Sequence, residues 1–433
     1  MCFDDVIGNG ALLGRVTLFV LGVLVPVMLA YAAAGHLPGK TWPVIALGAV
    51  AFTLMAMNLI LAARLPGLDA VFGGLDQIYW VHKWTGMIVL AAAFLHQQIK
   101  ISTDGLEVNA ALSQLAVEVA EVAFIVLAVL ILISFFKRVP RMPKITWEIP
   151  YGLWRWSHRL LGGVFLALAF HQAFVKAPFD SNALLSVWLN AMALAGAAAF
   201  LWSQFGFLYR RHSYRVAAVV KHAAATIVDL EPVGRGATVR PGSFAFVHFS
   251  SKGLGEPHPF TVSQVRPGGG IQFSIRGLGD YTRHLRDVIT VGDTARVEGG
   301  YGRFHHHRGG AKQVWVAAGI GITPFLAWAD HLQPGDAEQI VLVYCVRNEA
   351  EGVALDRLRA AAERVPGFTL KLHMSDTDGR FDAGKLVGYL PFEIGQASLW
   401  FCGPAPMRDG LIKDLKAAGK TPRSVHFERF EFR

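Results

Sequence analysis

Four histidines lie in two similar stretches of apolar sequence. These stretches read Trp80-Val-His82-Lys-Trp-Thr-Gly86, followed by His96, and Trp156-Ser-His158-Arg-Leu-Leu-Gly162, followed by His171. His82 and His96 are 14 residues apart, which is about 21 Å along an α-helix and returns to nearly the same face. The spacing of 13 between His158 and His171 does not return to one face, so an overwound turn or a bulge is expected, with Gly162-Gly163 as a plausible place for it.

If both stretches form helices that run the same way through a membrane, the histidines meet at two levels. A bis-histidine pair at each level could hold one haem iron in six coordination, which suits electron transfer better than oxygen binding. Gly86 and Gly162 would leave room for a flat macrocycle, and Lys83 and Arg159 could meet its propionates. The alternatives are hydrogen-bonded core histidines and a transition-metal or proton path. Because ionisable groups inside a membrane are costly, four of them favour a functional role.

Six apolar segments are long enough to cross a membrane core of about 30 Å. They are roughly 12–34, 43–63, 79–98, 111–136, 152–174 and 182–208. One side then receives Arg64, Lys83, Lys137, Arg138, Arg141, Lys144, Arg210 and Arg211, and the other only Lys40, Lys100 and Lys176. By the positive-inside rule, both termini are cytoplasmic in a multi-pass protein of the cell inner membrane.

Composition narrows the class of protein. The 433 residues are mostly apolar up to about 210 and mixed thereafter, which predicts two or three domains. The net charge of +9 comes without a long basic run, so no nucleic-acid partner is expected. Cys2, Cys345 and Cys402 form no C-x-x-C pair, which argues against a disulfide scaffold or a cysteine-ligated cluster. The N-terminus lacks a basic signal region, so the first apolar helix is expected to be retained.

The second half of the chain changes to short alternating strands between turn signals, which predicts a small antiparallel barrel. Arg276, at a strand end and followed by glycines and Thr282, could hold a diphosphate. From about 312, strands alternate with helices, and glycines from Gly319 to Pro324 make a cradle for a pyrophosphate or nicotinamide. Arg347, after the next strand, could meet a 2′-phosphate, which favours NADPH over NADH; a solvated loop charge is the alternative.

Two further features leave alternatives open. The tract His305-His306-His307 invites a metal interpretation, but consecutive histidines without a second cluster are more often a solvated turn. The chain ends with Phe430 and Phe432, and an aromatic so close to a terminus could stack on a flavin ring or belong to a plain edge strand.

Together these motifs resemble the ferric reductase and NADPH oxidase superfamily, especially its compact bacterial members. The resemblance covers nearly the whole chain, with Tyr281 where the family often has Trp and Gly300 where it often has Pro. It implies that His82 and His158 hold an inner haem b and that His96 and His171 hold an outer one. The implied FAD-binding residues are His258, Pro259, Phe260, Thr261, Ser263, Arg276, Gly279, Asp280, Tyr281 and Thr282, with Phe430, or Phe432 as second choice, covering the flavin. The implied nucleotide-binding residues are Gly319, Gly321, Ile322, Thr323, Pro324, Arg347, Cys402, Gly403 and Pro404.

The expected fold is a ferric reductase-like six-helix transmembrane bundle at 1–210 joined to a ferredoxin-NADP reductase-like module. That module comprises an FAD-binding antiparallel β-barrel at 211–310 and an NAD(P)-binding α/β domain at 311–433. The expected function is electron transfer from cytoplasmic NADPH through FAD and two haems to dioxygen outside, giving superoxide. A ferric chelate as acceptor, or a periplasmic partner protein that accepts the electrons, are the alternatives.

Overall fold

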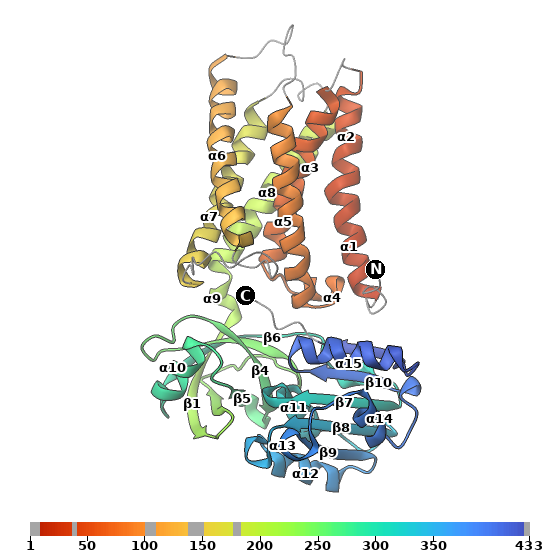
Figure 1. Cartoon of the computed structure of the whole chain (residues 1–433). Coiled ribbons are helices and arrows are strands. Elements are labelled where there is room, and N and C mark those ends of the chain that lie inside the picture. The colour runs from red at the N-terminus through yellow and green to blue at the C-terminus, as the bar shows by residue number, and fades with distance from the viewer. Residues whose placement is uncertain (1–8, 37–40, 100–109, 137–150, 176–182, 428–433) are drawn as a thin grey trace. The chain divides into compact units, whose positions relative to one another are not determined.

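The computed structural model describes residues 9–36, 41–99, 110–136, 151–175 and 183–427. The chain forms two compact units, which divide between Gly206 and Phe207. The first unit is helical and the second contains both β-sheets, as Figure 1 shows. Each unit is described by itself.

The helical unit is built from long apolar helices that lie side by side (Figure 1). They are α1 (Asn9–Phe19), η1 (Val20–Leu24), α2 (Val25–Ala34), α3 (Thr41–Ala62), the short α4 (Leu68–Phe72), α5 (Leu75–Gln98), α6 (Ala110–Phe136), α7 (Tyr151–Phe174) and α8 (Ala183–Phe205). The most buried of them is α3, which packs against α2, α5 and α8. Its residues are apolar around the whole circumference, as expected for a helix enclosed by others.

The first long helix contains one turn of π-helix, η1, directly before Pro26. Proline removes a backbone donor and clashes with the preceding turn, which is a common origin of such irregular turns. Gly22 lies within this turn against α3, where a Cβ atom would come within 2.4 Å of the Leu54 side chain. The sequence of this helix therefore accounts for both its irregularity and its close packing.

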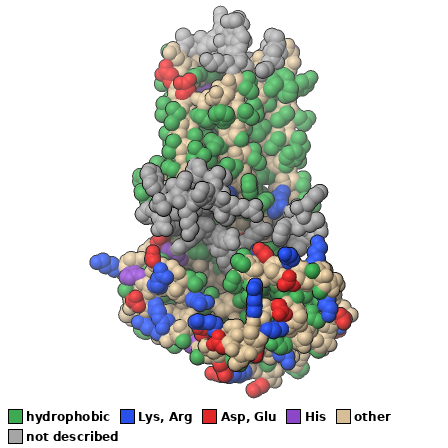
Figure 2. All heavy atoms as spheres, in the orientation of Figure 1, with side chains coloured by type: hydrophobic (Ala, Val, Ile, Leu, Met, Phe, Trp, Pro, Cys, Tyr) green, Lys and Arg blue, Asp and Glu red, His purple; other side chains and the backbone are tan. Residues whose placement is uncertain are grey.

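Five of the helical segments are long and apolar enough to cross a membrane: Leu12–Ala34, Thr41–Ala62, Leu75–Gln98, Ala111–Ser134 and Ala183–Phe205. The expected sixth segment, α7, has similar length but carries Arg155, Arg159 and two histidines, which lower its apolar character. Figure 2 shows the helical unit covered mainly by hydrophobic side chains, whereas the other unit carries a dense mixture of charges. The chain is a multi-pass membrane protein.

The second unit begins with the short helix α9 (Phe207–Arg210) and continues as a closed antiparallel barrel. Its strands are β1 (Arg211–Lys221), β2 (Thr226–Pro232), β3 (Phe244–Phe249), β4 (His258–Val265), β5 (Ile271–Ile275) and β6 (Thr294–Tyr301), in the order β1-β2-β5-β4-β3-β6. Helix α10 (Asp280–Val288) lies between β5 and β6 in the chain. The barrel interior is filled by alternating apolar residues such as Val216, Val228, Val247 and Phe273.

The remainder is a five-stranded parallel sheet with the order β11-β10-β7-β8-β9. Its elements are β7 (Lys312–Ala318), η5 (Gly319–Ile322), α11 (Thr323–His331), β8 (Gln339–Val346), α12 (Leu355–Arg364), β9 (Phe368–Met374), α13 (Ser375–Asp378), α14 (Ala383–Tyr389), β10 (Ser398–Cys402), α15 (Ala405–Ala417) and β11 (Ser424–Phe427). Strands β7, β8 and β10 are buried almost throughout, as expected for a parallel sheet covered on both faces.

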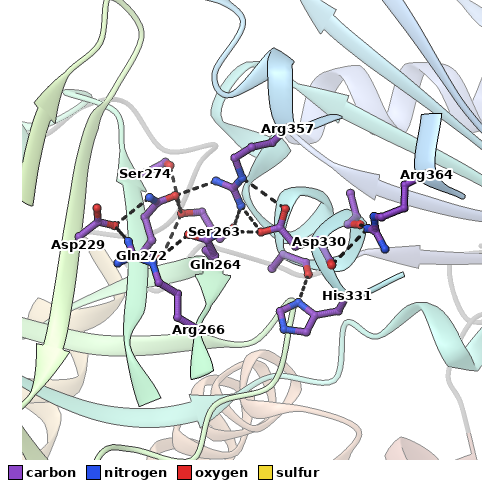
Figure 3. Close-up of polar contacts among 12 residues, drawn as sticks. Asp229, Ser263, Gln264, Arg266, Gln272, Ser274, Asp330, His331, Arg357 and Arg364 are labelled. Atoms are coloured by element: carbon purple, nitrogen blue, oxygen red, sulfur yellow. Dashed lines mark hydrogen bonds and ion pairs between the residues drawn. The ribbon is translucent and has the colours of Figure 1, made fainter. Parts of the chain in front are cut away.

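A polar network joins the barrel to the parallel-sheet domain (Figure 3). Arg357 of α12 pairs with Asp330 of α11 and also donates to the Gln272 side chain and the Ser263 carbonyl of the barrel. Asp330 in turn accepts from Gln264 of β4 at 3.0 Å. Arg357 and Asp330 are both partly buried, and their network links the two β domains.

Candidate functional site

The four histidines of the helical unit lie on two antiparallel helix pairs. The two histidines of α5 contact α3: Nδ1 of His82 lies 3.2 Å from the carbonyl of Asn58, and Nδ1 of His96 lies 2.8 Å from that of Val44. The two histidines of α7 contact α6 in the same manner. His171 Nδ1 lies 3.0 Å from the carbonyl of Ala116.

The fourth contact, between His158 Nδ1 and the Ser134 hydroxyl at 3.2 Å, has a defined direction. The single hydroxyl proton of Ser134 goes to the Leu130 carbonyl, and the hydroxyl oxygen already accepts from Trp154 Nε1 at 3.0 Å. Nδ1 of His158 must therefore donate. Because a carbonyl can only accept, the other three Nδ1 atoms donate as well. In the tautomer with Nδ1 donating, Nε2 is the ring nitrogen that would bind a metal.

This arrangement of donors fits iron ligation. Metal-bound histidines typically donate their other ring nitrogen to a carbonyl or similar acceptor, which fixes the ring and its tautomer. The centroids of the His82 and His158 rings are 6.1 Å apart, and the ring planes are inclined by 66°. Metal–imidazole bonds of about 2 Å would place two such centroids about 6 Å apart. The structure therefore brings one predicted pair together at a separation that one iron would fill.

Two expectations about the glycines of these helices are wrong. Helix α7 is α-helical throughout, so the bulge predicted at Gly162-Gly163 is absent. Each imidazole of α7 reaches its own acceptor on α6, and no bulge is needed. Gly162 packs against the ring of Phe200, which lies 2.1 Å from where its Cβ would be, so this glycine leaves space for α8.

In the barrel, the predicted flavin residues gather at the ends of β4 and β5. His258 is buried, and its ring stacks on that of Tyr281 with centroids 3.6 Å apart. The Tyr281 hydroxyl donates to the Leu254 carbonyl, and burial raises the pKa of this phenol. Asp280 and Thr282 lie in the first turn of α10, where the Thr282 hydroxyl accepts from the backbone N–H of Gly279 at 3.0 Å.

The other residues of the β4 motif divide between two environments. Pro259, Phe260 and Thr261 are partly exposed on the strand. Ser263 is fully buried, and its hydroxyl donates to the Gln272 carbonyl at 3.0 Å. The geometry thus gives Ser263 a role within the barrel wall, and its contact with a cofactor stays a prediction.

The predicted nucleotide motifs meet at the carboxyl edge of the parallel sheet. Gly321 packs so closely on the end of β10 that a Cβ would lie 2.1 Å from the carbonyl oxygen of Cys402. Gly319 has φ +54°, and the guanidinium of Arg276 approaches to 3.1 Å from its Cβ position. Arg276 of the barrel, which could hold a diphosphate, is therefore a neighbour of the turn that begins at Gly319 in the parallel-sheet domain. This edge is where parallel α/β sheets bind nucleotides.

The helices that follow these turns complete the cradle. Ile322, Thr323 and Pro324 lead into α11, and Gly403 and Pro404 lead into α15. Two helix N-termini thus face the edge that carries Gly319 and Cys402, and their backbone N–H groups favour an anionic ligand. The residues present fit a diphosphate nucleotide.

Arg347 is exposed after β8 and pairs with Glu351. This ion pair raises the pKa of Arg347 and lowers that of Glu351. Phe430 and Phe432 lie outside the described residues, so their predicted contact with a flavin has no structural counterpart here.

The expectation of a solvated turn at the histidine tract is wrong for His306. Its side chain is 3% exposed and packs against Trp315 and Trp328. Burial and the neighbouring His307 and His305 lower its pKa to about 3, so the imidazole is neutral at physiological pH.

Several residues of the site had no sequence signal. The carbonyls of Asn58, Val44 and Ala116 hold histidines through the backbone, which leaves no mark on side-chain identity. Ser134 stands 24 residues before His158, and only the antiparallel pairing of α6 and α7 brings the two together. The positive-inside residues Lys137 to Lys144 lie outside the described residues.

Three family models match the chain in sequence order. A ferric reductase like transmembrane component matches residues 47–169, an FAD-binding domain matches 230–312, and an oxidoreductase NAD-binding domain matches 315–412. The first match contains His82, His96 and His158. The three matches identify a membrane oxidoreductase with FAD- and NAD(P)-binding domains.

Similar proteins share part of this organisation. The electron transfer component of toluate 1,2-dioxygenase from Pseudomonas putida is 26% identical over 197 residues, which cover 44% of this chain and 58% of that protein. A flavohemoprotein from Rhizobium meliloti is 26% identical over 223 residues, which cover 46% and 55%. The chain thus spans little more than half the length of these relatives. The crystal structure of a flavohemoglobin from Malassezia yamatoensis aligns over 98% of this chain and 100% of that one, at 16% identity and a TM-score of 0.48.

Proposed function

Because the chain belongs to the ferric reductase and NADPH oxidase superfamily, we propose that it carries electrons from cytoplasmic NADPH to an acceptor outside the membrane. When bound, FAD accepts a hydride and releases single electrons, and haem iron relays them one at a time. The observation that carries this proposal is the set of four imidazoles whose Nδ1 atoms are held by acceptors inside one helical unit, because metal-bound histidines are typically held in this way.

The proposed haem ligands act in two pairs. His82 and His158 would hold the inner haem b, supported by the 6.1 Å between their rings. His96 and His171 would hold the outer one, about 20 Å further along their helices. The role of the protein in this proposal is to orient the four rings through their Nδ1 contacts.

The proposed FAD site comprises the residues from His258 to Ser263 and from Arg276 to Thr282, with Phe430 covering the ring. The nucleotide site comprises the residues from Gly319 to Pro324 and from Cys402 to Pro404. The proximity of the two sites is supported by the approach of Arg276, in the FAD motif, to Gly319, in the nucleotide motif. The network around Arg357 would keep both sites in one relative orientation (Figure 3).

We assign six membrane-spanning helices, which are the five long apolar segments and α7. The chain then lies in the inner membrane of the cell, with both termini in the cytoplasm. The domains are then 1–210, 211–310 and 311–433. The lipid-facing apolar side chains of the helical unit support the spans. An electron that leaves an inside-negative cell is assisted by about 2.3 kcal/mol per 100 mV.

NADPH is the proposed reductant, with NADH as the alternative. Arg347 follows β8 at the edge where a 2′-phosphate would lie, and its pairing with Glu351 is exposed to solvent. Solvent screens an exposed ion pair, so a phosphate could displace the carboxylate. Arg347→Ala should raise the KM for NADPH and leave that for NADH unchanged. Equal changes in the two KM values would mean that Arg347 does not contact a 2′-phosphate.

Dioxygen, reduced to superoxide, is the proposed acceptor, and ferric chelates are the alternative small molecule. The support is the sequence of the outer loops, which are short and hold no evident iron- or siderophore-binding cluster. A second candidate is transfer to a periplasmic partner protein. The relative from Pseudomonas putida is an electron transfer component, which favours this alternative.

One experiment separates these functions. The purified protein, loaded with FAD and haem, receives NADPH without oxygen while the haem spectrum is recorded, and oxygen is then admitted in a cytochrome c assay. The proposal predicts haem reduction by NADPH and a signal that superoxide dismutase suppresses. Reduction of the haems followed by slow reoxidation in oxygen would favour a partner protein, and haems that NADPH does not reduce would refute electron transfer through them.

A further inference from the structure

The histidine tract between the two β domains lies at the edge of the parallel sheet opposite to the nucleotide motifs. His306 and His307 precede β7 in the short turn η4 (His306–Arg308), and Asp336 precedes β8. Both segments therefore reach the amino edge of neighbouring parallel strands. One ligand atom from each of these three residues lies within 4.8 Å of the other two.

The turn that carries the histidines is held rigidly. Gln313, which is 1% exposed, donates to the His306 carbonyl at 3.0 Å and to the Gly310 carbonyl at 3.2 Å. Its own side-chain oxygen accepts from Trp315 Nε1 at 3.0 Å. Through these three hydrogen bonds, the buried Gln313 side chain holds the backbone of the histidine tract in place.

The His306 side chain carries a polar atom that the fold does not satisfy. Nδ1 of this ring is shielded from solvent and has no hydrogen-bond partner among the described residues. A buried polar atom without a partner destabilises the fold, so one that persists calls for a specific explanation. Hydrophobic packing alone would be served better by a phenylalanine at this position.

Asp336 adds a carboxylate to the two imidazoles of this cluster. Its Oδ2 accepts from the backbone N–H of Gln333 at 2.9 Å, which orients the carboxylate. Two imidazoles and one carboxylate are a typical ligand set for zinc, with a fourth position left for water. In a tetrahedral zinc site the ligand atoms are about 3.3 Å apart. The exposed His307 side chain could close the remaining distance by rotation.

We propose that His306, His307 and Asp336 form a site for a divalent transition-metal ion such as Zn²⁺, which ties the segment between the two β domains to the loop before β8. His305 belongs to the same tract but not to this group, so it serves as a matched control. The site is independent of the haem and nucleotide sites, and its loss should not change electron transfer from NADPH to a soluble dye.

The test uses the full chain loaded with haem and FAD, purified through a tag that contains no histidine. Equilibrium dialysis against Zn²⁺ alone, with metal measured by mass spectrometry, should give one tightly bound ion per chain. Asp336→Asn and His307→Ala should each weaken binding at least tenfold, whereas His305→Ala should leave it unchanged.

Zinc should also raise the unfolding temperature of the wild-type chain and of His305→Ala, but not that of Asp336→Asn. Wild-type affinity in both Asp336→Asn and His307→Ala would overturn the site. Equal weakening by His305→Ala would also overturn it, because binding would then belong to the tract as a whole. Asp336 and His307 are not fully buried, so these variants should fold.

Discussion

Replacing Ser134 by alanine tests whether His158 is positioned to bind iron, without touching a proposed ligand. The Ser134 hydroxyl accepts from His158 Nδ1 at 3.2 Å and from Trp154 Nε1 at 3.0 Å, and the Trp154 ring stacks on the imidazole at 5.2 Å. Alanine removes the one oxygen that accepts both hydrogen bonds. Each hydrogen bond contributes about 0.5–1.5 kcal/mol, so the ring loses about 1–3 kcal/mol of orientation energy.

This loss should appear in haem affinity at the inner level. Because 1.4 kcal/mol corresponds to a factor of ten, we expect haem to bind there about 5- to 150-fold more weakly. The assay is transfer of haem to an excess of a haem-scavenging apoprotein, followed by absorbance. Loss should be biphasic, with the wild-type rate retained for the outer haem.

Two variants serve as controls for this measurement. Ser134→Thr keeps the hydroxyl and should behave like the wild type. Ser157→Ala removes a neighbouring hydroxyl that donates to the Trp154 carbonyl, so it should have little effect on haem binding. If Ser134→Ala retains wild-type haem affinity and spectrum, the ring is not held through Nδ1 and the reasoning fails.

Three further changes test the second unit. Arg357→Ala breaks the network between the β domains and should lower the free energy of unfolding by about 2–4 kcal/mol, measured by urea denaturation. Gly321→Ala places a Cβ 2.1 Å from the Cys402 carbonyl and should weaken nucleotide turnover by a factor on the order of 100, whereas Gly388→Ala, with open space, should not. Burial lowers the pKa of His426 to about 4, so stability should fall as pH drops from about 6.5 towards 4, and thermal unfolding of His426→Gln should show a smaller decline.

The helical unit was largely predictable because its helices are long and apolar. The structure places α3, α5 and α8 within a few residues of the expected segments. Prediction failed at Gly162-Gly163 because it required both histidines of α7 to point in one direction. In the structure each finds its acceptor at a different level of α6, and a regular helix suffices.

In the second unit, the local motifs could be predicted from the sequence, but their arrangement in space could not. The motif residues Arg276, Gly319 and Cys402 were visible as strand-end signals, because glycine turns and strand periodicity are local properties. Their meeting at one edge depends on sheet order, which a single sequence does not determine. Asp336 and His306 come together for the same reason, through two parallel strands that lie side by side.

The packing of the two β domains against each other could not be predicted from the sequence either. Arg357 stands 94 residues after Ser263, and neither belongs to a recognisable interaction motif. Their contact depends on the packing of α11 against both α12 and β4. Such long-range polar contacts depend on the whole fold, whereas turns and helices depend mainly on nearby residues.

The most direct test of the central claim is a count of porphyrins by pyridine haemochrome absorbance on fully loaded protein. The account predicts two haems for each polypeptide in the wild type and one in His96→Ala, which should still transfer electrons from NADPH to a soluble dye. Fewer than two haems in the wild type, or two retained in His96→Ala, would contradict it.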